Sequence, residues 1–179
     1  MKIMFISDIH GIKTNLEKVR EEYQKHQCNK LVVLGDLYYM GPKQKVIEDY
    51  DSSYVNEFLE SFQDNLICMR GNCDSDVDKK ISNFPILEEL SVISTGKLDI
   101  YLTHGNIYNE DNWKKNNSIL VYGHYHIPFI KEKGNNLFIN PGSISLPRGD
   151  YEPSYMILEN DIFTIYDILG KELFQKKVG

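Results

Sequence analysis

The first half of the chain alternates short apolar runs with longer amphipathic segments. Residues 2–7 are apolar in their middle, as expected for a strand buried on both faces of a sheet. Residues 15–27 and 53–63 repeat apolar side chains at helical spacing among polar ones. Two more short apolar runs, 30–34 and 66–69, predict further strands. This order of strand, helix, strand, helix, strand predicts a parallel α/β arrangement.

The pattern changes after Pro85, where short β-type segments are separated by Gly, Asn and Asp residues. Only residues 110–116 have a brief helical pattern. We expect the second half to be mainly a β-sheet packed against the first half. The predicted fold is α/β, a single domain over residues 1–179 with two facing sheets and outer helices. The strands predicted in the second half are 91–95, 98–103, 119–122, 128–131, 137–140, 154–158 and 162–168.

The overall composition narrows the class of function. The chain carries a net charge of −6, which argues against nonspecific nucleic-acid or membrane-surface binding, because both favour a basic surface. No apolar stretch approaches the roughly 18 residues of a membrane span. The first strand meets Ser7, Asp8 and His10 at once, so the apolar segment of a secretion signal is lacking and we expect a cytoplasmic protein.

Side chains that can bind metals follow five of the predicted strands, at the point where each strand ends. In open α/β sheets, ligands bind outside the carboxyl ends of the strands. Taken alone, the motifs around Asp8, Asp36 and Asn72 are more often solvated turns, His104 indicates almost nothing, and His124-x-His126 is as often a metal site as not. Four of the five histidines lie in these motifs, however, and the conjunction predicts a site for two metal ions. The residues are Asp8 and His10 after the first strand, Asp36 after the second, Asn72 after the third, His104 after 98–103, and His124 and His126 after 119–122.

The order of these motifs resembles that of a known enzyme family, the calcineurin-like metallophosphoesterases. The motifs are Asp8-x-His10, Gly35-Asp36, Gly71-Asn72-Cys73-Asp74, His104-Gly105 and Gly123-His124-x-His126. Together with Asn140-Pro141-Gly142-Ser143, they are similar to those of the small bacterial and archaeal phosphodiesterase branch. The resemblance implies a four-layer α/β/β/α sandwich of two facing mixed sheets, which agrees with the pattern of apolar segments.

The resemblance also implies which residues hold the metals. Asp8, His10, Asp36 and His126 would bind one divalent ion, and Asp36 would bridge to a second ion held by Asn72, His104 and His124. Asp36, Asn72 and His104 are given catalytic roles as well. Carboxylate, imidazole and amide ligands suit Mn²⁺, the first choice, or Ni²⁺, Co²⁺, Fe²⁺ or Zn²⁺. The implied reaction is in-line attack on a small phosphoester, foremost a phosphodiester, by a hydroxide that bridges the metals.

Four further residues are candidates for contact with the substrate. Cys73 stands where the wider superfamily commonly has a histidine thought to protonate the leaving group, and the alternative is a small buried apolar side chain. Tyr39 and Tyr125 either line the substrate cleft or simply pack. Arg148 either meets a phosphate or supports its own loop.

Other functions stay open alongside the phosphodiesterase. One is a non-catalytic binding scaffold of the same fold, and others are a phosphomonoesterase and a dinucleoside polyphosphate hydrolase. The complete ligand set favours an enzyme, because a eukaryotic scaffold relative has lost one metal-site histidine. The acidic charge makes a nuclease the weakest alternative. The sequence leaves the physiological substrate, the metal and a homo-oligomeric state open.

Overall fold

The first apolar run forms β1 (Ile3–Ile6), and both faces of this strand are buried. Ile3 and Phe5 point into one apolar core, whereas Met4 and Ile6 point into another. Because side chains alternate across a strand, a continuous apolar run is what a strand covered on both faces requires. The structure is a computed structural model that describes residues 1–41 and 47–179.

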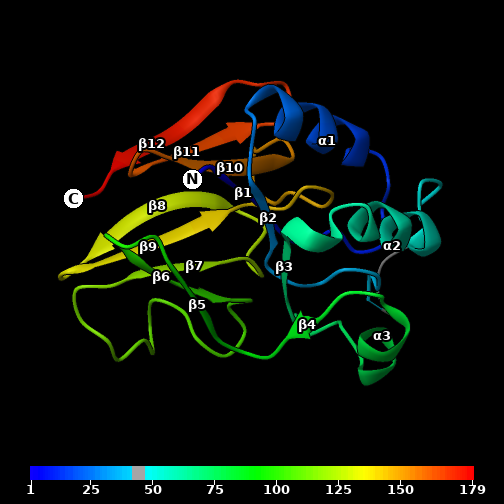
Figure 1. Ribbon diagram of the computed structural model, residues 1–179, viewed down its shortest axis with the longest axis horizontal. Coiled ribbons are helices and arrows are strands. Elements are labelled where there is room, and N and C mark those ends of the chain that lie inside the picture. The colour runs from blue at the N-terminus through cyan, green and yellow to red at the C-terminus, as the bar shows by residue number, and fades with distance from the viewer. Residues whose placement is uncertain (42–46) are drawn as a thin grey trace.

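One face of the β1 sheet is covered by helices. α1 (Leu16–Lys25) and α2 (Ser52–Glu60) bury Leu16, Val55 and Phe58 in the core that also holds Met4 and Ile6. Figure 1 shows both helices on the same side of β1, β2 (Lys30–Val33) and β3 (Leu66–Met69). These three strands pair in parallel, as the sequence predicts.

The sheet that contains β1 has seven strands, in the order β12-β11-β10-β1-β2-β3-β4. The prediction that the second half packs as a separate sheet is wrong for its last strands, because β10 pairs antiparallel with β1. An alternating pattern gives the faces of a strand but not its neighbour, so the sequence did not reveal this pairing. The four strands not yet given are β4 (Ile86–Leu87), β10 (Ser154–Glu159), β11 (Ile162–Asp167) and β12 (Glu172–Lys177).

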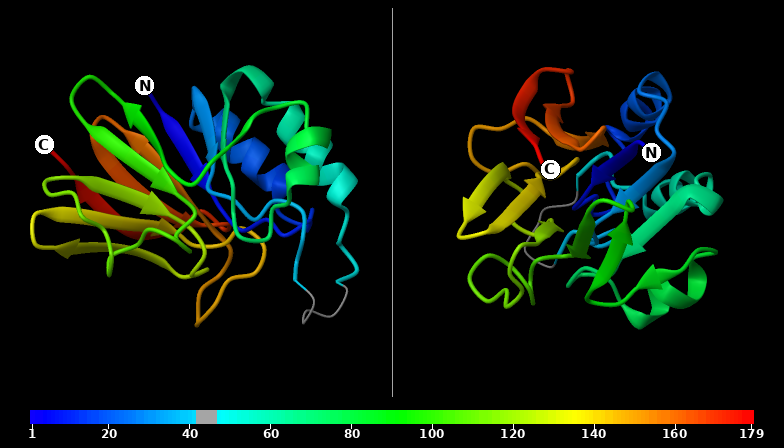
Figure 2. Two further views of the ribbon diagram at one scale, coloured as in Figure 1. Left: turned by 90° about the horizontal axis from the view of Figure 1, so that it is seen from below. Right: turned by 60° about the vertical axis from the view of Figure 1, so that its left-hand side comes forward.

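The second sheet has five strands, in the order β5-β6-β7-β9-β8. It faces the larger sheet across the core that holds Ile3 and Phe5, where Leu102 and Val121 pack from its own strands (Figure 2). The expectation of two facing mixed sheets with outer helices is confirmed. The strands are β5 (Ser91–Ser94), β6 (Asp99–Thr103), β7 (Ile119–Tyr122), β8 (Pro128–Lys133) and β9 (Asn136–Pro141).

The outer face of the smaller sheet is covered by the segment between β6 and β7. Trp113 packs on Tyr101 with 5.2 Å between ring centroids, and its Nε1 donates a hydrogen bond to Ser118 Oγ at 2.8 Å. The brief helix expected over 110–116 is wrong, because this segment forms turns and irregular backbone. Among the described residues, this fourth layer is therefore a loop rather than a helix.

Two short helical elements were not expected, the 3-10 helix η1 (Gln63–Asn65) and α3 (Asp76–Ile81). α3 has no buried residue and therefore no apolar stripe, but Ser75 and Asp78 form a capping box at its start. No helix within residues 1–41 and 47–179 has the length and apolar character needed to cross a membrane.

Candidate active site

The predicted ligands follow strands that run in parallel within each sheet. In the larger sheet these are β1, β2 and β3, and in the smaller sheet they are β6 and β7. Parallel strands place their carboxyl ends at one edge, so the loops that follow them meet there. The structure brings the carboxylates and most of the histidines of these loops into contact.

Asp8, His10 and His126 form one half of the cluster. The Nε2 atoms of His10 and His126 lie 3.3 Å apart. Asp8 Oδ1 lies 3.2 Å from His126 Nε2 and 3.8 Å from His10 Nε2. All three residues are buried.

Asp36 joins this half to a second one. Its Oδ2 lies 3.7 Å from His10 Nε2 and 3.4 Å from His104 Nε2. His104 Nε2 in turn lies 3.1 Å from Asn72 Oδ1. A carboxylate between two groups of nitrogen and oxygen donors is the arrangement that a bridging ligand requires.

The imidazole rings are oriented from behind by backbone carbonyl groups. The Nδ1 atoms of His10, His104 and His126 lie 2.7, 2.7 and 2.6 Å from the carbonyl oxygens of Tyr39, Leu34 and Leu146, respectively. A carbonyl oxygen only accepts, so each Nδ1 carries the proton and, in the neutral ring, each Nε2 directs a lone pair into the cluster.

Inward-facing lone pairs repel one another unless a cation lies between them. The two Nε2 atoms lie 3.3 Å apart with carboxylate oxygens of Asp8 and Asp36 as their neighbours, and buried Asp8 Oδ1 has no hydrogen-bond partner among the described residues. Nitrogen and carboxylate oxygen together suit the first-row transition metals. The donor set therefore fits divalent metal ions.

The backbone at these residues adopts a conformation that side chains with a Cβ rarely take. The φ angles of Asp8, His10, Asp36, His124 and His126 lie between 54° and 66°. Such left-handed residues cost on the order of 1–3 kcal/mol each and gather at functional sites.

Two glycines allow the loops to approach the carboxylates closely. A Cβ on Gly123 would lie 1.8 Å from Ser7 Oγ and 2.7 Å from Asp8 Oδ2. A Cβ on Gly71 would lie 2.1 Å from Asp36 Oδ1. Any larger residue at either position would push apart the loops that carry the ligands.

The electrostatics of the cluster favour bound positive charge. Burial acts to raise the pKa of Asp36, but the hydrogen bond and charge of His104 and the Cys73 N–H lower it to about 2. Burial likewise opposes ionisation of Asp8, but His126 and His104 lower its pKa below the ordinary value. Burial disfavours the charged form of His104, yet Asp36 and Asp8 raise its pKa to about 9.

Asn72 and His124 lie at the edge of the cluster. Asn72 is exposed and contacts His104, whereas His124 is half-buried, with its ring centroid 5.1 Å from that of His104. The backbone N–H of His124 donates a hydrogen bond to Asp8 Oδ2 at 3.0 Å. Among the described residues, the close groups of His, Cys, Asp and Glu donors do not include His124. The cluster is thus buried at Asp8 and open to solvent on the side of Asn72.

The residues expected to contact substrate lie at different distances from the cluster. Cys73 is the nearest, because its Sγ groups with donor atoms of His10 and Asp36 within 4.8 Å. Tyr39 supplies the carbonyl behind His10 and is 46% exposed. Arg148 is exposed in the loop after β9, and its backbone N–H donates to the His126 carbonyl at 3.0 Å.

Tyr125 is the fourth of these residues. Its ring is half-buried against Tyr122 and Phe129, with centroids 5.7 and 6.4 Å away, on the outer face of the smaller sheet. It also lies beside His124, 6.0 Å between centroids. The Tyr125 ring therefore packs against its aromatic neighbours, and it does so next to the predicted ligand His124.

Two side chains in the sequence motifs hold the loops together, although ligand chemistry alone does not identify them. Asp74 accepts backbone N–H groups of Asp36, Leu37 and Gly71 at 2.9, 2.8 and 2.7 Å. Asn140 Nδ2 donates to the Gly123 carbonyl at 2.6 Å. Their places in the Gly-Asn-Cys-Asp and Asn-Pro-Gly-Ser motifs were the available signal.

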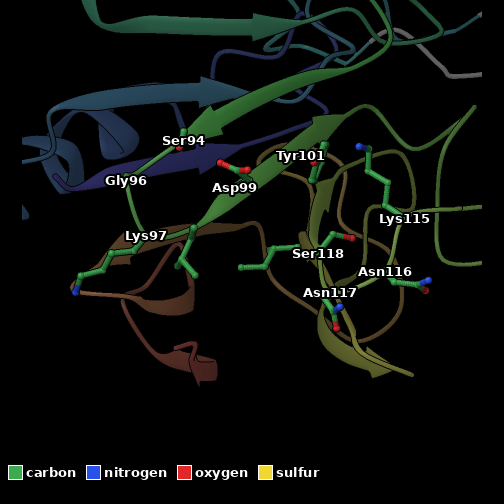
Figure 3. A pocket seen from close by; sticks show the side chains of 11 residues that line it. Ser94, Gly96, Lys97, Asp99, Tyr101, Lys115, Asn116, Asn117 and Ser118 are labelled. Carbon is green, nitrogen blue, oxygen red and sulfur yellow. The ribbon is translucent and has the colours of Figure 1, made fainter.

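A cavity of about 550 Å³ lies away from these residues, at the start of β6 and β7. Figure 3 shows Lys97 and Asp99 on one side of it, and Lys115 and Ser118 on the other. His104 follows the opposite end of β6. The cavity contains none of the predicted ligands, so the donor cluster locates the candidate active site.

Comparison with known proteins agrees with the geometry. The family model of the calcineurin-like phosphoesterase superfamily domain matches residues 1–161. Phosphodiesterase YfcE of Escherichia coli strain K12 is 38% identical over 167 residues, which cover 92% of this chain and 91% of that protein. Probable metallophosphoesterase YsnB of Bacillus subtilis strain 168 is 27% identical over 186 residues, which cover 97% of this chain and 95% of that protein.

A solved structure agrees as well. The structure of Yfce, described as a phosphoesterase from E. coli, has a TM-score of 0.95 and 35% sequence identity and covers 100% of both chains. The whole fold and the Asp/His cluster therefore occur together in this chain and point to a metal-dependent phosphoesterase. The chain belongs to the calcineurin-like phosphoesterase superfamily.

Proposed function

We propose that this protein is a phosphodiesterase that works with two divalent metal ions, Mn²⁺ first among them. The observation that carries the proposal is the gathering of three Nε2 atoms and two buried carboxylates in one cluster of two halves that Asp36 joins. The similarity to a phosphodiesterase at 38% identity supports the choice of a diester. The proposed ligands are Asp8, His10, Asp36 and His126 for one ion, and Asp36, Asn72, His104 and His124 for the other.

Two bound cations would lower the pKa of a water molecule at the site. They would also offer positive charge to the phosphate oxygens of the substrate. The chain's part is to hold them close together, and Asp36 does so by facing both halves of the cluster. Asp8 and Asp36 also offset part of the positive charge. The remainder suits an anionic phosphoester, which enters from the exposed side at Asn72 and lies beside His104.

The substrate contacts belong to the same proposal. Cys73, at the open side, touches the leaving group, and exposed Tyr39 meets the organic part of the ester. Arg148 and Tyr125 stand beside the His126 and His124 ends of the site and contact the substrate's far side. An acidic chain with this arrangement takes a small phosphoester rather than a nucleic acid.

We propose that residues 1–179 act as one domain in the cytoplasm. The family match over residues 1–161 supports a single catalytic unit. All seven proposed ligands come from one copy of the chain. The proposal therefore applies equally to a monomer and to a homo-oligomer.

The test begins with a nitrophenyl phosphodiester, Mn²⁺ and the chelated protein as the blank. Asp36→Asn should lower kcat by at least about 100-fold, because changes one shell further out already cost 10–100-fold. It should also lower the number of bound metals, since the neutral amide lacks the negative charge with which Asp36 would bind both ions. Asn72→Ala and His126→Ala should each lower activity less than Asp36→Asn.

Two results would contradict the proposal. One is an Asp36→Asn protein that keeps two metals and near wild-type turnover. The other is a wild-type protein that binds metal yet shows no turnover above the chelated blank, which would favour the scaffold.

A further inference from the structure

Ser143 is a fully buried residue whose hydroxyl joins two loops of the site. Its Oγ donates to the carbonyl oxygen of Asp8 at 2.8 Å. The same Oγ accepts the N–H groups of Ser145 and Leu146 at 3.1 and 2.8 Å. A hydroxyl has one donor and two acceptor positions, so all of its hydrogen-bonding capacity is used.

Both branches of this small network end at residues of one proposed metal. The Asp8 carbonyl belongs to a residue with φ of 56°, so the hydrogen bond from Ser143 helps to hold a strained backbone. On the other branch, the Leu146 N–H is fixed by Ser143, and the Leu146 carbonyl lies 2.6 Å from His126 Nδ1. Two hydrogen bonds, joined through the Leu146 backbone, therefore connect Ser143 Oγ to the Nδ1 proton that sets the His126 tautomer.

We propose that Ser143 is a positioning residue for the metal ion of Asp8, His10 and His126. It fixes the Asp8 backbone and, through Leu146, the ring orientation and tautomer of His126. The inference rests on the proposed ligand assignment for this ion. It goes beyond that assignment, because it gives a function to a buried side chain outside the proposed ligand set.

The structure provides a matched control for a merely structural serine. Ser154 is also fully buried, and its Oγ donates to a backbone carbonyl, that of Pro141, at 2.6 Å. Pro141 and Ser143 lie in the same turn, and the Ser154 backbone N–H donates to the Ser143 carbonyl at 3.1 Å. The Ser154 hydroxyl, which the variant removes, has no hydrogen bond among the described residues to a proposed ligand or to Leu146. His104 is an internal control, because its Nδ1 partner is the Leu34 carbonyl on the far side of the cluster.

The first measurement uses the metal-free proteins and needs no activity. In nitrogen-15 spectra of the histidine rings, wild type should show His126 as the Nδ1–H tautomer. Ser143→Ala should give a mixture of tautomers at His126 and leave His104 unchanged. Ser154→Ala should leave both rings unchanged. Ser143→Cys, which fills a similar volume with a weaker donor, repeats the test with less disturbance of packing.

The second measurement is calorimetric titration with Mn²⁺. Ser143→Ala and Ser143→Cys should weaken the binding of one ion by about 10–100-fold, as loss of an outer-shell partner typically does. The binding of the other ion should change much less.

The inference is wrong if the Ser143 variants keep the wild-type His126 tautomer and Mn²⁺ affinity, or if Ser154→Ala changes both equally. Failure of the proposed function looks different. Wild type would then bind no Mn²⁺, although Ser143→Ala would still alter the His126 ring.

Discussion

At the scale of single residues, the site depends on groups held in place from behind. Three histidines turn Nε2 inward because a backbone carbonyl occupies each Nδ1. In the metal-free protein this leaves buried carboxylates beside imidazoles, and a proton on His104 takes the place of a cation. Metal binding and protonation therefore compete for the same lone pairs.

This competition predicts how stability changes with pH. The pKa of His104 is raised from 6.5 to about 9, so its stabilising contribution is complete below pH 6.5 and lost as pH rises through about 9. We expect the metal-free protein to become less stable over this range. Saturating Mn²⁺ should remove the loss, because the metal replaces the proton.

Urea unfolding at a series of pH values tests this, with His104→Gln as the variant that should flatten the metal-free curve. His26→Ala is the control, because His26 lies beside Glu22 on α1, outside the cluster. An equal slope for wild type and His104→Gln would contradict the prediction.

Cys73 leads to a prediction about leaving groups. In the metal-free protein, burial and the Asp36 carboxylate raise the pKa of its thiol to about 12. Even at its ordinary pKa of about 8.5, a thiol is a weaker acid than an imidazolium, so Cys73 is a poor general acid. Cys73→Ala should therefore change turnover of a nitrophenyl diester by less than about tenfold. Cys73→His should improve substrates with poor leaving groups selectively.

The measurement is log kcat/KM against leaving-group pKa for wild type and both variants. A shallow wild-type slope that becomes steep in Cys73→Ala would identify Cys73 as the acid after all.

Residue types and spacing were enough to predict that Asp and His side chains gather at one edge of the sheets, because carboxylates and histidines at strand ends have few other reasons to recur. The carbonyls of Leu34, Tyr39 and Leu146 could not be predicted, since every residue has a carbonyl and only the fold selects these. The left-handed backbone at Asp8 and Asp36 could not be predicted from the sequence either, because neither residue is a glycine.

At the scale of elements, apolar runs predicted β1 to β3 and both long helices, since these segments bury one stripe or both faces. Elements that are very short or little buried were missed. α3 buries nothing, and β4 has only two residues. The 110–116 segment has a helical pattern but uses Trp113 to cover a sheet instead. Partner choice was the other failure, because nothing in the β10 pattern specifies β1.

Asp74 fastens the end of β2 to the end of β3, and its removal should affect both. Asp74→Ala leaves three backbone N–H groups without their acceptor, so we expect a loss of stability on the order of 2–4 kcal/mol. It should also weaken the binding of the metal assigned to Asn72 by about 10–100-fold. Urea unfolding and Mn²⁺ titration measure the two effects.

Asp167→Ala is the matched control. Asp167 is buried and accepts the N–H groups of Leu169 and Lys171 in the turn after β11, away from the site. It should lose stability but keep metal affinity. Unchanged metal affinity in Asp74→Ala would show that Asp74 serves the fold alone.

At the scale of the whole molecule, the proposed ligands come from loops of both sheets, so a bound metal would tie the two sheets together. Mn²⁺ at a hundredfold excess over Kd should stabilise the native state by about 2.7 kcal/mol. For a chain of this length that raises Tm by about 5–10 °C. EDTA should reverse the shift, and thermal unfolding with each additive measures it.

His26→Ala should leave this difference between Mn²⁺ and EDTA unchanged, whereas His126→Ala should abolish most of it. The opposite pattern would mean that the wrong histidines have been assigned.

The position of β1 between β2 and β10 has a consequence for synthesis. Met4 of β1 pairs with Ile157 of β10, about 150 residues later in the chain. At about 5–20 residues per second, a ribosome that has made Met4 needs roughly 8–30 s to reach Ile157. During that time one edge of β1 is unpaired in the nascent chain, and it is still unpaired when His126, the last of the proposed ligands, has been made. Ribosome-bound chains that stop short of β10 should therefore be the form most dependent on chaperones.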